Sequence, residues 1–158
     1  MSRSVKNIGR SAFLGCVNVE NIAFSEGLIN IGEFAFCGCL SIRTVALPAT
    51  VSRIENNAFD GCANLESITI PNNVKEIERG VFAGCLGIRT VTLPTTVTRI
   101  GDYAFCRCTN LESITIPSSV KEIGMAFGGC ENLTIRTERG SYAERYALEN
   151  EIAIEYLR

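Results

Sequence analysis

The chain has 158 residues and a formal net charge of −2 at pH 7, and 46% of its residues are hydrophobic. This length fits one domain, 1–158, with an ample core, and the small net charge gives no basic surface of the kind that binds nucleic acid. The sequence has no histidine, which removes Ser-His and Cys-His nucleophile pairs and the commonest metal ligand. We therefore expect neither an enzyme nor a cofactor.

The first residues of the chain contain no apolar run of the kind found in a secretion signal, and no stretch predicts insertion into a membrane. Taken alone, this start indicates a cytosolic protein. Val5 and Ile8, however, already occupy positions that recur throughout the chain. Residues 1–7 are therefore interpreted as a truncated first repeat, and we expect the chain to be a piece of a longer protein whose signal lies elsewhere.

A pattern with a period of 23 residues runs through residues 8–135. The recurring positions are Cys16, Cys39, Cys62, Cys85, Cys108 and Cys130, with Phe13, Phe36, Phe59, Phe82, Phe105 and Phe127, and with Pro48, Pro71, Pro94 and Pro117. A period of about 20 to 29 residues is typical of leucine-rich repeats. One unit cannot bury its own apolar side chains, so stacked units are expected to bury them jointly.

The unit at residues 54–76 shows how each repeat is expected to fold. Leu65 to Ile70 alternates apolar and polar residues, which predicts a strand with one buried face. Pro71 ends that strand because it has no N–H to donate. Ala58 to Cys62 is too short for a long helix, so we expect one tight helical turn there.

These residues resemble the BspA-like leucine-rich repeat family, whose pattern is close to I-G-x-x-A-F-x-G-C-x-x-L-x-x-I-x-I-P-x-x-V. Residues 31–39 and the unit at 54–76 match it, and the resemblance covers roughly residues 5–135. It implies an α/β repeat: a right-handed solenoid of about six 23-residue units, with short strands on the concave face and short helical turns opposite. It also implies a cell-surface or secreted protein concerned with adhesion and host contact. Small departures from the pattern occur at Ser25, Glu55, Glu78, Val81 and Arg107.

The eight cysteines suggest a disulfide framework only at first sight. Side chains in one column are parallel and about 5 Å apart, so their Cβ atoms do not converge as a disulfide requires. We expect the six column cysteines to be reduced and buried. Cys37 and Cys106 stand outside the column, three units or about 15 Å apart, which is too far to share one zinc ion.

Charge alternates between successive units in two columns. One column is Glu20, Arg43, Glu66, Arg89 and Glu112, and the other is Asn30, Arg53, Glu76, Arg99 and Glu122. Opposite charges on neighbouring strands contribute roughly 0.2–1 kcal/mol per pair. We interpret the pattern as solubility and register control, with recognition of a ligand as the alternative. Glu55 and Glu78 are a candidate carboxylate pair for acid–base chemistry, but we expect two solvated surface acids.

The strand positions that face away from the core are the candidate binding surface. They are Glu20, Arg43, Thr44, Glu66, Ser67, Thr69, Arg89, Thr90, Thr92, Glu112, Ser113 and Thr115, with Asn21, Ala23 and Ala46 beside them. Interface hot spots are usually Trp, Tyr or Arg, and only two arginines qualify. We therefore expect a protein-binding or adhesion module whose weak contacts are multiplied by avidity. The alternatives are a structural spacer within a longer surface protein and, more remotely, an ice-binding row of Ser and Thr.

The two ends of the array are expected to differ. After Leu133 the repeat pattern stops, and residues 136–158 are expected to cap the last repeat with a short helix and a closing strand. Ser141 and Glu144 form a capping box at the start of that helix. The N-terminal end has no such cover, so we expect self-association through it or fraying of residues 1–7.

Overall fold

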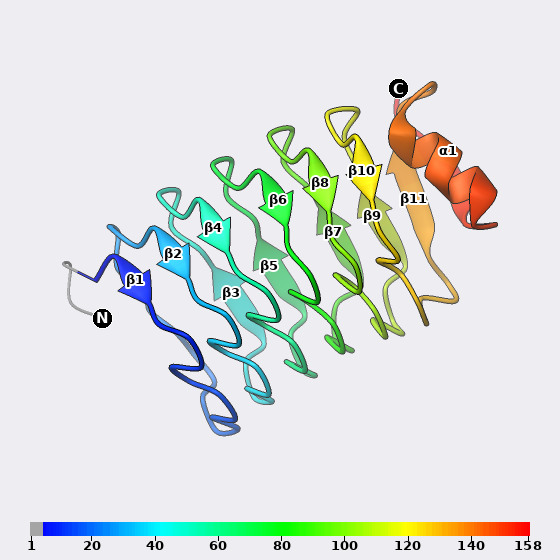
Figure 1. The fold of residues 1–158 in the computed structure, drawn as a ribbon. Helices are drawn as coiled ribbons and strands as arrows, with labels where there is room; N and C mark the ends of the chain where they lie inside the picture. The colour runs from blue at the N-terminus through cyan, green and yellow to red at the C-terminus, as the bar shows by residue number, and fades with distance from the viewer. Residues whose placement is uncertain (1–4) are drawn as a thin grey trace.

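The computed structural model describes residues 5–158, which coil into a stack of parallel turns (Figure 1). The first four residues of the expected truncated repeat lie outside the described residues. Each turn has three walls: a two-residue strand, a run of hydrogen-bonded turns, and a longer strand of three residues in most units. The predicted leucine-rich-repeat solenoid is confirmed. Its right-handed sense and the concavity of one strand wall stay predictions.

The first wall, here called the short-strand wall, lies at the front of Figure 1. It consists of β1 (Asn7–Ile8), β2 (Asn30–Ile31), β4 (Arg53–Ile54), β6 (Glu76–Ile77), β8 (Arg99–Ile100) and β10 (Glu122–Ile123). In each strand the isoleucine is buried, while the polar residue before it is exposed or, at Asn30 and Arg99, half-buried. Isoleucine therefore lies beside isoleucine in the parallel register, as between Ile8 and Ile31.

The second wall, here called the long-strand wall, lies behind the first in Figure 1. It consists of β3 (Thr44–Ala46), β5 (Ser67–Thr69), β7 (Thr90–Thr92), β9 (Ser113–Thr115), β11 (Thr134–Thr137) and β12 (Ala153–Tyr156). The pairs are parallel, and the sheet orders are β12-β11-β9-β7 and β3-β5. Val45 and Val91 point into the core, so the predicted strand with one buried face is present.

The third wall, here called the turn wall, is not helical, and the predicted helical turn is wrong. Alternate N–H groups stay local, as when Ala35 N donates to Gly32 O, while those between them cross to the next unit, as when Phe36 N donates to Ala58 O. Phe34 and Gly38 adopt positive φ values of 56° and 71°. Because left-handed residues interrupt a right-handed helix, the segment becomes a chain of turns.

Phenylalanines stack along the inside of the turn wall as one column. The ring centroids of successive Phe residues lie 5.1–5.9 Å apart with interplanar angles of 2–24°. Phe59 and Phe82 are fully buried, as predicted. At the C-terminal end Tyr146 meets Phe127 edge-on at 6.1 Å and closes the column.

The column cysteines lie beside these rings as free thiols. Cys39, Cys62, Cys85 and Cys108 are fully buried, as predicted. The terminal members Cys16 and Cys130 are only half-buried, because a column end is covered on one side less completely than its middle. The expectation of six buried thiols is therefore wrong for these two.

Both strand walls lose their ladder at the same unit boundary, here called the seam. No pairing joins β4 to β6 or β5 to β7 among the described residues, although the turn wall stays bonded there through Phe59 N and Val81 O. At the seam Glu55 and Glu78 occupy matching positions of neighbouring units, and at every other boundary at least one of these two positions is a glycine. A Cβ at Gly101 would lie 2.9 Å from Arg79 N, so two side chains at one boundary leave no room for the ladder.

A helix and a strand close the C-terminal end, as predicted. The helix α1 (Tyr142–Glu149) begins at Ser141, whose side chain accepts a hydrogen bond from Glu144 N. The Glu144 side chain accepts a hydrogen bond from Gly140 N, so the reciprocal bond of the predicted capping box comes from the residue before Ser141 and not from Ser141 itself. Ala143 and Ala147 are buried, and β12 extends the long-strand wall beyond β11.

Candidate binding surface

The solvent side of the long-strand wall brings the predicted Ser and Thr positions together. The parallel register places Thr44 beside Ser67 and Ala46 beside Thr69. It likewise places Thr90 beside Ser113 and Thr92 beside Thr115. The side chains on β3, β5 and β7 are exposed, and Ser113 and Thr115 are half-buried. Small hydroxyl side chains therefore form two rows along the wall.

Ion pairs flank these rows at the residue before each strand. Arg43 Nη1 lies 2.9 Å from Glu66 Oε1, and Arg89 Nη1 lies 2.6 Å from Glu112 Oε1. The prediction of opposite charges on neighbouring units is thus confirmed for two boundaries. Exposed pairs of this kind contribute roughly 0–1 kcal/mol each, so their main effect is on the charge pattern of the surface.

The first unit does not extend this surface as expected. Residues 19–25 form no strand in the described chain, so the expectation that Glu20, Asn21 and Ala23 are strand positions is wrong. Glu20 is exposed near the wall, but Arg43 pairs with Glu66 on its other side.

Four residues on the same surface were missed by the sequence analysis. Thr134 lies beside Ser113 and Arg136 beside Thr115 in β11, and Ala153 and Glu155 continue both rows in β12. Arg136 Nη2 donates to Glu155 Oε1 over 3.1 Å. The signal was the alternation around buried Ile135. It was hidden because β11 pairs with β9 at a spacing of 21 residues, two fewer than the 23-residue period.

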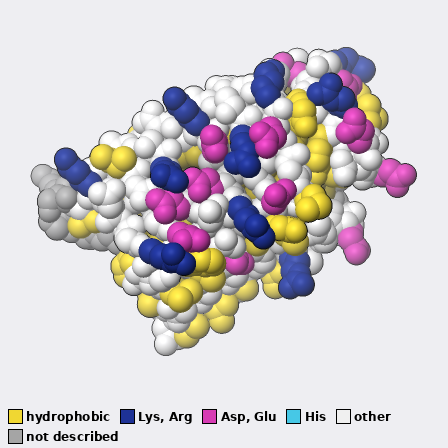
Figure 2. Space-filling model, in the orientation of Figure 1, with side chains coloured by type: hydrophobic (Ala, Val, Ile, Leu, Met, Phe, Trp, Pro, Cys, Tyr) yellow, Lys and Arg dark blue, Asp and Glu magenta, His cyan; other side chains and the backbone are white. Residues whose placement is uncertain are grey.

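The short-strand wall carries a denser set of charges, and both signs mingle across it in Figure 2. Arg99 lies between Glu76 and Glu122, at 3.5 and 3.1 Å. Arg53 lies 3.1 Å from Glu78 and 3.9 Å from Glu55. The hydrogen bond that Arg53 Nε donates to Glu78 Oε1 raises the pKa of Arg53, so the guanidinium stays charged.

Glu55 and Glu78 are therefore not the two solvated acids that we expected. Arg53 lies between them, and Glu55 also accepts hydrogen bonds from Asn30 Nδ2 and Glu33 N. Their side chains are only 27% and 19% exposed. Through these contacts with Arg53, Asn30 and Glu33, the two glutamates connect neighbouring units. Their role is therefore structural.

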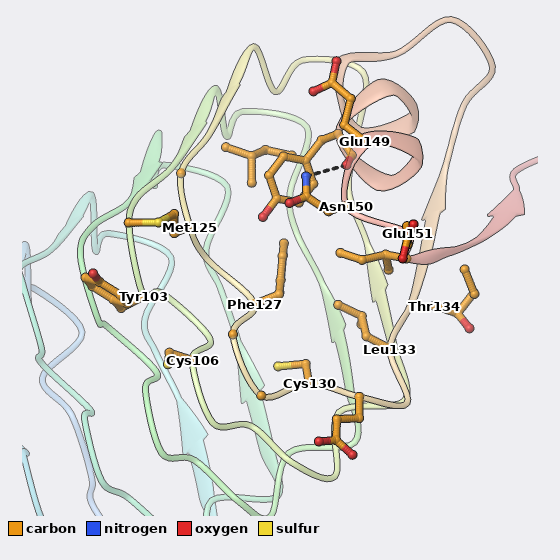
Figure 3. Close-up of a pocket in the computed structure, with 18 of the residues that line it drawn as sticks. Tyr103, Cys106, Met125, Phe127, Cys130, Leu133, Thr134, Glu149, Asn150 and Glu151 are labelled. Atoms are coloured by element: carbon orange, nitrogen blue, oxygen red, sulfur yellow. Dashed lines mark hydrogen bonds between the residues drawn. The ribbon is translucent and has the colours of Figure 1, made fainter.

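A groove opens between the last turn run, residues 124–130, and the cap, and we call it the cap groove. It has a volume of ≈1090 Å³ and is lined by residues that include Tyr103, Met125, Phe127 and Tyr146. Figure 3 shows Met125 and Tyr103 on one side of Phe127 and the helix end with Glu149 on the other. A smaller hollow of ≈460 Å³ lies at the seam beside Arg53.

The described residues hold no group of three or more side chains that could bind a metal ion. Burial raises the pKa of Cys62 and of Cys108 to about 12 and that of Cys130 to about 11. These thiols are neutral at pH 7 and are poor nucleophiles, because the thiolate is the reactive form. Within residues 5–158, no helix is both long and apolar enough to cross a membrane.

The sequence matches the BspA type leucine rich repeat region in six copies, over residues 1–111 and 77–155. The chain belongs to this family. A leucine rich cell surface protein from Faecalibacterium prausnitzii is 34% identical, with a TM-score of 0.74 over 81% of this chain and 35% of that one. The leucine rich repeat protein TpLRR of T. pallidum is 26% identical, with a TM-score of 0.74 over 96% of this chain and 79% of that one.

A leucine-rich repeat protein from Bacteroides ovatus shares the fold at 24% identity, with a TM-score of 0.62 over 99% of this chain and 54% of that one. The present chain thus spans between a third and about half of the length of the F. prausnitzii and B. ovatus proteins. No curated protein matches the sequence. The repeat scaffold, of the kind that serves protein interaction, is shown by the family and by these structures.

Proposed function

We propose that the chain is a non-catalytic module of a bacterial surface protein that binds another protein through its long-strand wall. The observation that carries the proposal is the row of exposed Ser and Thr side chains on β3, β5 and β7, flanked by ion-paired arginines. Family membership and the cell-surface description of the F. prausnitzii protein support this placement. Adhesion is the role that follows for such a module.

Low affinity per module is part of the proposal. The exposed positions of the wall carry Thr, Ser and Ala, and the arginines that would anchor a partner are already engaged by Glu66, Glu112 and Glu155. A partner must displace these carboxylates or contact them in place. Repetition of the module along a longer protein would then supply the avidity.

The alternative is a spacer that holds other modules apart. The mutual pairing of Arg43 with Glu66 and of Arg89 with Glu112 favours it, because paired charges need no external partner. A spacer predicts that charge reversal on this wall changes no binding at all. The ice-binding alternative finds less support, since Ala46 and Ala153 end the two hydroxyl rows and Arg136 takes a hydroxyl position beside Thr115.

The test compares the affinity for a partner after charge reversal on the long-strand wall with the affinity after charge reversal beside the short-strand wall. The chain is immobilised at high density, retained proteins are identified, and their affinity is measured for the variant Arg43→Glu/Arg89→Glu. We expect affinity to fall by about tenfold or more, as for loss of an interface arginine. A fall of this size supports the long-strand wall as the site.

The matched control is Lys75→Glu/Lys121→Glu. These lysines lie beside the short-strand wall, are exposed, and are 46 residues apart, as Arg43 and Arg89 are. The two variants therefore have the same change in net charge and the same spacing on different walls. Equal loss in both variants, or loss in the control alone, would place the site elsewhere.

We propose in addition that the first described turn self-associates. Leu14 and Val17 are exposed, and the carbonyls of Arg10, Ala12 and Leu14 occupy positions that accept interunit bonds in later units. Sedimentation velocity over a concentration series should show an association that Leu14→Lys weakens. A monomer at every concentration would refute this proposal and leave the binding proposal untouched.

A further inference from the structure

The cap groove displays backbone donors that every earlier unit boundary uses. Along the turn wall, Phe82 N donates to Ala104 O over 2.9 Å and Gly84 N donates to Cys106 O over 2.8 Å. One unit later, Phe105 N and Arg107 N make the same two bonds, to Ala126 O and Gly128 O. The turn wall is thus a ladder in which alternate N–H groups always point toward the C-terminal neighbour.

At the last unit the same two N–H groups have no acceptor. Phe127 N and Gly129 N occupy these ladder positions, and neither donates to any group within residues 5–158. The cap covers the Phe column through Tyr146 but adds no further turn run. Both residues line the cap groove, and Gly129 is exposed. The groove therefore offers two N–H donors, two residues apart, which can bond to every second carbonyl of another extended chain segment.

The charged residues that line the cap groove are all acidic. Its lining includes Asp102, Glu131, Glu149 and Glu151 and no lysine or arginine. Asp102 accepts a hydrogen bond from Met125 N, whereas the three glutamates form no ion pair within residues 5–158. An occupant with a positive charge would be the first partner of these carboxylates.

The aromatic side chains of the groove already attract guanidinium groups. Arg79 stacks on Tyr103 with 5.1 Å from Cζ to the ring centroid, and Arg145 stacks on Tyr142 at 4.9 Å. Tyrosine faces favour cations in this geometry. Beside them Met125 is 66% exposed and gives an adaptable apolar contact. Apolar, aromatic and acidic groups thus surround the two free donors.

We propose that the cap groove binds an extended segment of a partner protein that carries a basic side chain. Alternate carbonyls of the segment accept hydrogen bonds from Phe127 N and Gly129 N, in place of a further repeat. An apolar side chain of the segment packs on Met125 and Tyr103, and its basic side chain lies against Glu131 or Glu149. Main-chain bonds give such a site affinity, and the side-chain contacts give it selectivity. The groove reaches the long-strand wall at Thr134 and Ala153, but the proposal does not depend on the function proposed for that wall.

The direct test is a titration of the whole chain, labelled with ¹⁵N at glycine and phenylalanine. The probe is a blocked peptide in which lysine and valine alternate. The amide protons of Phe127 and Gly129 should move downfield as they acquire acceptors. Phe82 and Gly84 provide internal controls, because their N–H groups are already bonded. Shifts confined to the controls, or no shifts at all, would overturn the proposal.

Charge selectivity is tested with a second peptide and a variant pair. A peptide with glutamate in place of lysine, and the variant Glu131→Lys/Glu149→Lys with the lysine peptide, should each bind about tenfold more weakly, since each loses two charge contacts. The control Glu26→Lys/Glu138→Lys changes net charge equally at exposed positions outside the groove and should bind normally. Equal binding of both peptides would overturn the basic partner. Unfolding midpoints of all variants show whether they are folded.

Discussion

The Sγ atom of Cys62 lies 3.2 Å from the carbonyl oxygen of Phe36, one unit earlier, and donates a hydrogen bond to it. Cys85 makes the same bond to Phe59, and Cys108 makes it to Phe82. The thiol thus ties each turn to the preceding one at a carbonyl that lies beside the stacked rings. Cysteine suits this position because it is small, apolar enough for the core, and still a weak donor.

Replacing Cys62 by alanine should cost about 1–2 kcal/mol of unfolding free energy, from the loss of a buried sulfur and its hydrogen bond. Urea unfolding measures the change. Cys37→Ala is the control, because Cys37 lies outside the column and is half-buried; it should change stability by less than about 0.5 kcal/mol. Equal effects at both positions would show that the column bond contributes nothing particular.

Stability should fall when the pH rises above 9. Burial raises the pKa of Cys62 and Cys108 from 9.0 to about 12, whereas the unfolded chain ionises near 9.0. A raised folded pKa contributes stability that is complete below the unfolded pKa and is lost as the pH rises through the folded pKa. Unfolding midpoints measured from pH 7 to 11 should therefore be constant and then decline. A flat profile for wild type would contradict the burial of the thiols.

Native thiol labelling should divide the cysteines into two groups. Cys16, Cys37 and Cys106 are half-buried and should react, while the four buried thiols should not. Cys130 is also half-buried, but its raised pKa of about 11 should make it react more slowly than those three. This corrects the expectation from the sequence that all six column cysteines are buried. Mass spectrometry after alkylation under native conditions identifies the labelled sites. Modification of Cys62 or Cys85 before unfolding would show that the column opens.

Arg107→Gly should stabilise the protein. Arg107 has φ of 60° at a position where the other units have glycine with φ between 66° and 81°. Removing Cβ relieves left-handed strain, and the greater freedom of glycine in the unfolded chain offsets part of the gain, so we expect about 0.5–1 kcal/mol. Gly84→Ala is the reverse control and should lose about 1 kcal/mol. Stabilisation by both changes would exclude backbone strain as the cause.

Among the backbone amides of the short-strand wall, those at the seam should exchange fastest with solvent. Thr98 N and Gly101 N donate to Lys75 O and Ile77 O, whereas Lys75 N and Glu78 N find no equivalent acceptors among residues 5–158. Exchange monitored by NMR should therefore protect Thr98 and Gly101 more than Lys75 and Glu78. Equal protection would show that the ladder is continuous in solution.

The repetition in the sequence was enough to predict the solenoid, its core columns and its cap, because each depends on apolar spacing alone. The turn wall was not predictable in the same way. Its left-handed residues include Ser11, Phe34, Asn57 and Tyr103, and these four residue types share no preference for positive φ. Hydrogen bonds from neighbouring units impose the conformation instead. The seam depends on two glutamates meeting across a boundary, which is visible only once the register is known.

The candidate surface was predicted in its middle and missed at its ends. The 23-residue spacing identified the surface positions from Thr44 to Thr115. Arg136 and Glu155 belong to the same surface only because β11 and β12 pair with it in the folded protein. The cap groove could not be predicted from the sequence either. The N–H groups of Phe127 and Gly129 lack acceptors because the cap adds no further turn run beside them.

Carboxylate footprinting of a captured complex tests the proposed function most directly. Glu66, Glu112 and Glu155 lie on the long-strand wall with side chains 56–57% exposed, and Glu76 and Glu122 lie on the short-strand wall at 51% and 62%. The two groups should therefore label at similar rates in the free chain, and each serves as reference for the other. We predict that the partner protects the first group and leaves the second unchanged. Protection of Glu76 and Glu122 instead would contradict binding through the long-strand wall.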